Sequence, residues 1–207
     1  MKVQGLPSVE SLTVHLVFFF SGVAALVYQL VWQRSLLMIY GSNAESVAMV
    51  VAAFLVGLGL GSLGGGAVSR RKGVSLVRVF AAAELGIGMY GAVSLKLFRF
   101  LGSHTDQVGS LQTGWWAFLL VLVPTMLMGA TLPLLVAWQV KVSGAVGDAV
   151  ARLYAVNTLG GALGAFLAAF VVLGSLGLSG AVRLAVVTNL VSAVTILVVA
   201  RGKGWRG

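Results

Sequence analysis

Apolar residues occur along this chain in long blocks separated by short polar segments, such as SRRKG at 69–73 and KVSGAVGD at 141–148. A helix of about 20 apolar residues crosses the roughly 30 Å hydrocarbon core of a bilayer. The pattern therefore predicts an all-α integral membrane fold. Its six spans are expected at about 12–38, 46–68, 75–100, 114–140, 150–173 and 179–200. The last connection, LGSLGLSG, is expected to be a tight turn between the final two spans.

Composition supports the same conclusion, because only 9% of the 207 residues are charged and 59% are hydrophobic. Soluble domains carry about 25% charged residues. The predicted environment is the lipid bilayer, and residues 1–207 are interpreted as a single membrane domain. The first span is longer than the apolar region of a signal peptide, about 7–15 residues, so it is expected to be retained.

The net charge of +9 comes from basic residues that lie in small groups between apolar blocks. This distribution excludes the continuous basic stripe of a nucleic-acid-binding protein. Of the 14 Lys and Arg residues, ten lie near the two ends and in the second and fourth connections, and four lie on the opposite side. The positive-inside rule therefore predicts that both ends are cytoplasmic, with Arg70, Arg71 and Lys72 as anchors.

The segment GLGLGSLGGG at 57–66 contains the spacing G-x-G-x-x-G of dinucleotide-binding loops. That motif requires a preceding strand within a βαβ unit, and no strand is predicted here. Glycines four residues apart in a membrane helix instead form a flat strip for close helix packing. The predicted packing glycines in spans two and five are Gly57, Gly61, Gly65, Gly160 and Gly164.

Glu84 is the acidic residue that lies well inside an apolar span, about 12 Å along the helix from Leu76. A carboxyl group at that depth is costly, so it should face the bundle interior. There it would pair, be protonated, or meet a cationic ligand. The residues do not decide between a functional acid and one that ties helices together.

Span four contains Pro124 and Pro133 on either side of Gly129. Carbonyl groups freed by proline in a membrane are satisfied by neighbouring helices, hydroxyls or water. Thr125 and Thr131 are suitable donors, and the bend either lines a path or improves packing. The residues proposed for a substrate or ion path are Glu84, Asn157, Thr125, Thr131 and Gln29. For Asn157, a hydrogen-bonding bridge between helices is favoured over a role in a path.

Soluble-enzyme chemistry is not predicted. The chain has two histidines, five scattered acids and no cysteine, so neither a metal site nor a paired-carboxylate site is visible. We therefore predict no catalytic residue, no metal and no cofactor.

A weak internal repeat pairs LVWQR in span one with VAWQV in span four. It is consistent with a three-plus-three inverted repeat, a common plan in transporters.

Three segments together carry a family resemblance. They are SGVAALVYQLVWQRSLLMIYGSNAESVAMVVAAFLVGLGLGSLGG, PTMLMGATLPLL and LYAVNTLGGALGAFLAAFVVLGSLGL. They resemble the membrane region of bacterial fused MFS/spermidine synthases. The resemblance implies an inner-membrane helical bundle, similar to half of an MFS transporter, beside a cytoplasmic aminopropyltransferase-like domain. GSLGGGAVSRRKG also looks like the MFS signature after the second helix, but it lacks the usual acid.

The sequence ends at Gly207, so the soluble domain is expected to be missing. The chain would then be naturally short or the front half of an interrupted protein. The leading hypothesis is a non-catalytic membrane module that anchors or feeds a cytoplasmic aminopropyltransferase-like partner. The alternative is a half-size MFS-like transporter, working as a homodimer, for a polyamine or another small solute. A purely structural subunit of a larger membrane complex is a third possibility.

Overall fold

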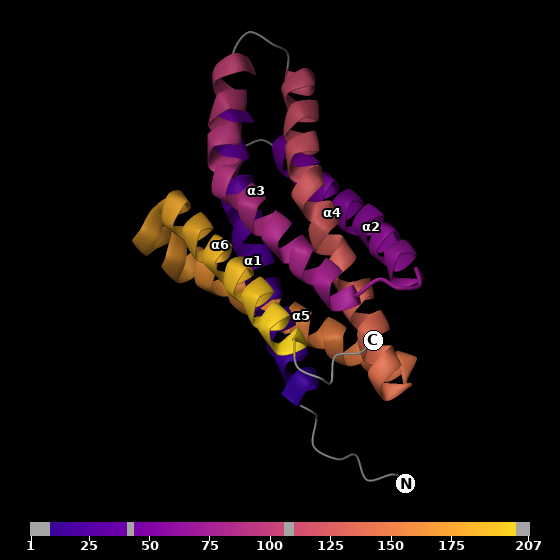
Figure 1. Cartoon of the computed structure of the whole chain (residues 1–207). Coiled ribbons are helices and arrows are strands. Elements are labelled where there is room, and N and C mark those ends of the chain that lie inside the picture. Colours follow the sequence, from indigo (N-terminus) through magenta and orange to yellow (C-terminus); the bar gives the residue numbers. More distant parts are fainter. Residues whose placement is uncertain (1–8, 41–43, 106–109, 202–207) are drawn as a thin grey trace.

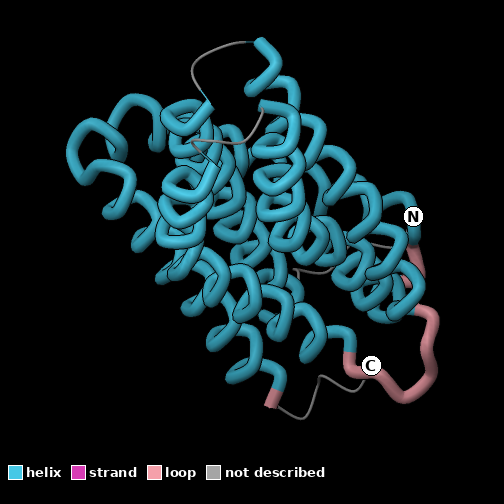
Figure 2. Tube along the Cα trace, turned by 90° about the horizontal axis from the view of Figure 1, so that it is seen from above, coloured by secondary structure: helices cyan, strands magenta, loops and turns pink. Residues whose placement is uncertain are grey.

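The computed structural model describes residues 9–40, 44–105 and 110–201. Apart from short turns these residues form helices, and no strand occurs among them (Figure 2). The elements are α1 (Val9–Tyr40), α2 (Ala44–Ser69), α3 (Leu76–Thr105), α4 (Ser110–Ser143), α5 (Val146–Leu167), the π-helix η1 (Ala168–Val172) and α6 (Leu173–Ala200). The expectation of an all-α fold is confirmed.

Five helical segments in the described part of the chain are long and apolar enough to cross a membrane, with mean hydropathies between 1.5 and 2.2. They are Val9–Ile39, Val47–Ser69, Leu76–His104, Gln112–Ser143 and Val146–Ala200. Large apolar side chains cover their outer surfaces, and those of Leu63 and Phe170 are 73% and 74% exposed. An apolar surface this extensive requires a membrane or a partner to cover it. The helices are therefore suited to a lipid bilayer.

The fifth segment, 55 residues long, contains both of the last two predicted spans. Residues 173–180 do not form a separate loop, because helical structure continues from α5 through η1 into α6. The direction changes at Gly177, whose φ of 64° and ψ of −175° are non-helical. Only glycine adopts this backbone conformation readily. The bend lets both α5 and α6 pack against α1 (Figure 1).

The glycines of α2 pack against α4. A methyl group at Gly61 would overlap the carbonyl oxygen of Met126, and one at Gly65 would overlap the backbone of Ala130. Gly57 lies in the same way against Thr125. The two intervening glycines, Gly59 and Gly64, have open space around them. The strip therefore brings α2 and α4 into backbone contact within one chain.

The glycines of α5 pack against α1 by the same device. A methyl group at Gly160 would overlap the carbonyl oxygen of Phe19, and one at Gly164 would overlap that of Val23. Small residues allow this approach in membranes, where helix association depends on close packing rather than on the hydrophobic effect. Both glycine strips are consequently occupied inside the chain and are not exposed to a second copy.

The two prolines of α4 each leave one carbonyl group without its usual donor, four residues earlier in the helix. For Pro124 that carbonyl belongs to Leu120, and it accepts a 2.5 Å hydrogen bond from the hydroxyl of Tyr90 on α3. For Pro133 it belongs to Gly129, which accepts a 3.1 Å bond from the hydroxyl of Ser62 on α2. Hydroxyl groups from neighbouring helices thus satisfy both carbonyls.

The threonines that we expected to be those donors bond elsewhere. The hydroxyl of Thr125 donates within its own helix to the carbonyl groups of Val121 and Leu122, both at 2.9 Å. The hydroxyl of Thr131 donates to the carbonyl of Met128 at 2.6 Å. A threonine bonds to carbonyls of its own preceding turn because its short side chain reaches them first. The longer Tyr90 can span the gap from α3.

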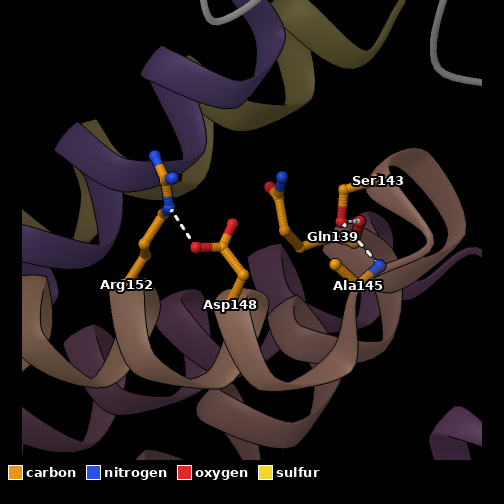
Figure 3. A network of polar contacts seen from close by, with 5 residues as sticks. All are labelled: Gln139, Ser143, Ala145, Asp148 and Arg152. Carbon is orange, nitrogen blue, oxygen red and sulfur yellow. Dashed lines mark hydrogen bonds and ion pairs between the residues drawn. The ribbon is translucent and has the colours of Figure 1, made fainter. Parts of the chain in front are cut away.

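One side of the bundle carries the start of α1, the α2–α3 turn, the α4–α5 turn and the end of α6 (Figure 1). We call it the basic side. Arg70, Arg71 and Lys72, the predicted anchors, are exposed there. The α4–α5 turn is drawn in Figure 3, where the hydroxyl of Ser143 accepts a 3.4 Å bond from the backbone amide of Ala145. On α5, Arg152 and Asp148 form an exposed ion pair at 2.8 Å (Figure 3).

Candidate functional site

Glu84 lies on α3 at the centre of the bundle, with no exposed surface. Each carboxylate oxygen accepts one hydrogen bond from another helix. The hydroxyl of Ser21 on α1 donates to Oε1 at 2.6 Å, and the amide Nδ2 of Asn189 on α6 donates to Oε2 at 2.7 Å. Hydrogen bonds to a charged group stabilise by about 1.5–3 kcal/mol each in soluble proteins. The acid therefore ties α1, α3 and α6 together.

These polar residues form a layer between two apolar clusters. On α3 the buried residues of the cluster nearer the basic side end with Ala81, and those of the other cluster begin at Ile87, with Glu84 between them. On α6 Asn189 likewise lies between Ala185 and Ala193. Apolar side chains flank the layer on both sides, so the hydrogen bonds inside it operate in a medium of low dielectric constant.

The layer has a definite depth. Counted at about 1.5 Å per residue from the basic-side end of each helix, its polar residues lie about 12–18 Å deep. This depth is near the middle of a hydrocarbon core about 30 Å thick. The residues that share it are Ser21, Glu84, Thr131, Asn157 and Asn189.

A cavity of about 110 Å³ adjoins the layer, and each of the six α-helices contributes at least one lining residue. Its volume is enough for a few water molecules or one small polar group. Five lining residues are polar: Ser21, Gln29, Thr131, Asn157 and Asn189. The others are apolar. Glu84 is not among them, but its two hydrogen-bond donors are, so the carboxylate lies directly behind the cavity wall.

One wall atom lacks a partner. Oδ1 of Asn189 is buried and accepts no hydrogen bond from the described residues. The amide cannot rotate to exchange its two ends without turning its oxygen toward a carboxylate oxygen of Glu84. A buried acceptor without a donor costs about 1–3 kcal/mol. The bond from Asn189 to Glu84 is therefore made at the cost of one unpaired oxygen beside the cavity.

Asn157 lies beside this centre on α5, where its amide Nδ2 donates a 3.1 Å bond to the carbonyl of Phe18 on α1. It thus bridges two helices and lines the cavity as well. Gln29 and Thr131 also line the cavity, whereas Thr125 lies outside it, against Gly57. The structure therefore brings four of the five proposed path residues to one place.

Two further polar side chains belong to this centre, and sequence reasoning did not group them with Glu84. They are Ser21 and Asn189. A signal was nevertheless present, because both lie at nearly the same depth as Glu84 when counted from the same side of the membrane. Matching buried polar residues by depth would have paired them.

Tyr28 on α1 is fully buried, and it is therefore not an interfacial anchor of the kind that tyrosine often forms. Its ring stacks on that of Trp32, with centroids 5.0 Å apart. A methyl group at Gly91 on α3 would overlap the tyrosine ring. Gly91 therefore makes the space that this ring occupies, and Tyr28 is part of the apolar core.

One comparison with known proteins gives a match. The chain is 30% identical over 184 residues to polyamine aminopropyltransferase 2 of Streptomyces coelicolor. The aligned region covers 86% of this chain and 32% of that relative. The chain thus spans about a third of the relative's length. No family model matches the sequence. No solved structure matches it either. The similarity links the apolar helical bundle to a polyamine-related protein.

Proposed function

We propose that this chain is the membrane module of a spermidine-synthase-like system in a bacterial inner membrane. It anchors or feeds a cytoplasmic aminopropyltransferase-like partner and transfers no aminopropyl group itself. The observation that carries this proposal is the similarity over 86% of the chain to a relative named for aminopropyl transfer. The match occupies only 32% of that relative. We assign the transferase chemistry to a part that this helical stretch does not represent.

The proposal includes six crossings with both ends in the cytoplasm. The segment Val146–Ala200 has 55 residues, and a straight helix of that length would extend about 80 Å, far beyond a 30 Å core. The bend at Gly177 divides it into two parts of spanning length. The excess of Lys and Arg on the basic side supports a cytoplasmic location for that side.

Single cysteines provide the topology test, because the chain has none of its own. Ser143→Cys lies at the α4–α5 turn, and Ser103→Cys and Ser179→Cys lie toward the other side; all three serines are exposed. In intact cells an impermeant maleimide should label Cys introduced at 103 and 179 but not at 143. Labelling at 143 would reverse the orientation, and protection at 179 would remove the sixth crossing.

A three-plus-three repeat also belongs to the proposed architecture. The strip of α2 packs on α4 and the strip of α5 packs on α1, which are equivalent contacts if the second half repeats the first. The residues that face the glycines are offset by the same number of positions in the two halves. Met126 lies 107 positions after Phe19, and Ala130 lies 107 positions after Val23. The Trp-Gln pairs beginning at 32 and 138 differ by 106. The shared offset of the packed residues, from which the Trp-Gln pairs deviate by one position, supports a repeat of the kind found in halves of MFS transporters.

Purification in mild detergent tests the function. A tagged form of the chain, expressed in its own host, should retain a protein with aminopropyltransferase activity, measured by transfer from decarboxylated S-adenosylmethionine to a polyamine. A tagged six-span membrane protein of unrelated sequence serves as the control. Recovery of the chain without such activity, from cells whose lysate contains it, would contradict the proposal.

A second candidate function is passage of a polyamine or another small solute through a homodimer. The favouring observation is the cavity to which all six helices contribute, with a buried carboxylate behind its wall. Because both glycine strips are occupied within the chain, a second copy would have to use another face. In proteoliposomes Glu84→Gln should abolish the flux of labelled putrescine while leaving folding intact. The absence of flux in the wild type would exclude this candidate.

A further inference from the structure

The α2–α3 turn forms a hollow of about 590 Å³ on the basic side, together with the first turn of α3 and the end of α4. Five of its nine lining residues have cationic side chains, and they come from three different elements. These are Arg70, Arg71, Lys72, Arg78 and Lys141. The hollow therefore concentrates positive charge more than a row of basic residues along one helix would.

This charge is not neutralised within the described part of the chain. The acidic side chains described there are those of Glu10, Glu84 and Asp148, and none forms an ion pair with any of the five basic residues. Asp148 is bonded to Arg152 on α5. Like charges held this close together repel one another, and an anion in the hollow would remove that repulsion.

A second feature of the hollow also favours an anion. Ser75 and Val74, which directly precede the 30-residue helix α3, are among its lining residues. The first backbone N–H groups of a helix have no partner within the helix, and they carry partial positive charge. The hollow thus combines basic side chains with the end of a long helix that favours anions.

The position of the hollow indicates which anion it takes. The apolar part of α2 ends at Ser69, and that of α3 begins at Leu76, so the hollow lies where the hydrocarbon core meets the headgroups. Arginine binds phosphate through two parallel hydrogen bonds, and basic pockets at this depth bind phospholipid headgroups. We propose that the hollow binds the phosphate group of an anionic phospholipid. This assignment is independent of any role in polyamine chemistry.

Native mass spectrometry with added phosphatidylglycerol tests the proposal, with phosphatidylcholine of the same acyl chains as the neutral comparison. The wild type should bind phosphatidylglycerol more tightly. The double variant Arg78→Gln/Lys141→Gln should weaken that binding about 30-fold, because it loses two basic contacts near the membrane surface. Competing inorganic phosphate should have little effect, since it lacks the acyl chains that bring the headgroup to this depth.

The matched control is Lys96→Gln/Arg183→Gln, which removes one lysine and one arginine from exposed positions outside the hollow. Its affinity should equal that of the wild type. The single variant Lys141→Gln, at the end of α4, serves if the double variant does not fold. Equal weakening in test and control variants, or equal affinity for the two lipids, would overturn the proposal. Full displacement by inorganic phosphate would show that the hollow binds a soluble anion instead. Unchanged lipid binding in Arg78→Gln/Lys141→Gln would show that the lipid binds elsewhere, and an acidic protein surface would then be the ligand of the hollow.

Discussion

The contact between α2 and α4 yields the sharpest prediction, because two neighbouring glycines of one helix differ in what faces them. Gly61→Ala places a methyl group onto the carbonyl oxygen of Met126, which is backbone and cannot move alone. Gly59→Ala adds the same methyl group to open space. Both changes gain the same helix propensity, so the difference between the two variants isolates the steric overlap.

Overpacking a close contact typically lowers the free energy of unfolding by about 1–3 kcal/mol. For a chain of this size each kcal/mol corresponds to a shift of about 2–4 °C in melting temperature. Gly61→Ala should therefore melt on the order of 2–12 °C below Gly59→Ala. The five tryptophans allow intrinsic fluorescence to follow thermal unfolding in a single detergent. Equal melting temperatures for the two variants would refute the backbone contact between α2 and α4.

Three further predictions concern single features. Gly177→Ala should lower the free energy of unfolding by about 1–3 kcal/mol, because an alanine is strained at the positive φ of 64°. The control Gly174→Ala adds a methyl group to open space and should not lower it. Equal melting curves for the two variants would contradict the bend. Tyr90→Phe removes the donor to the carbonyl freed by the first proline of α4, and it should cost about 0.6–2 kcal/mol in chemical denaturation. Asn189→Ala should cost about 0.6–3 kcal/mol in wild type but less in the Glu84→Leu background, which has no acceptor oxygen at this position. Additive effects would show that the two side chains are not coupled.

The sequence does not show which helices of this bundle pack against each other. The spans are apolar on nearly all sides, so no polar stripe marks the face that each helix buries. The spacing of Gly57, Gly61 and Gly65 predicts a close contact, yet it does not name the partner. The partner α4 becomes known only when the rotation of both helices about their axes is fixed.

The proline helix α4 shows a similar division. That freed carbonyls need donors follows from Pro124 and Pro133 alone, because their missing N–H groups are a property of the residue type. Nearby threonines are the natural candidates in sequence, but the donors come from α2 and α3. Which side chains reach a given carbonyl depends on distances between helices, and these distances are absent from the linear chain.

The sequence by itself determined that apolar helices of membrane-spanning length form, because a block of 20 apolar residues needs no tertiary partner to be stable in lipid. It also determined that Glu84 must be buried, since a carboxyl group exposed to hydrocarbon is costly. Only the tertiary structure decided that Ser21 and Asn189 hold this acid and that all six helices share one cavity. The physical reason is that hydrophobic length belongs to each segment alone, whereas a hydrogen bond across the bundle requires several helices at one depth and one rotation.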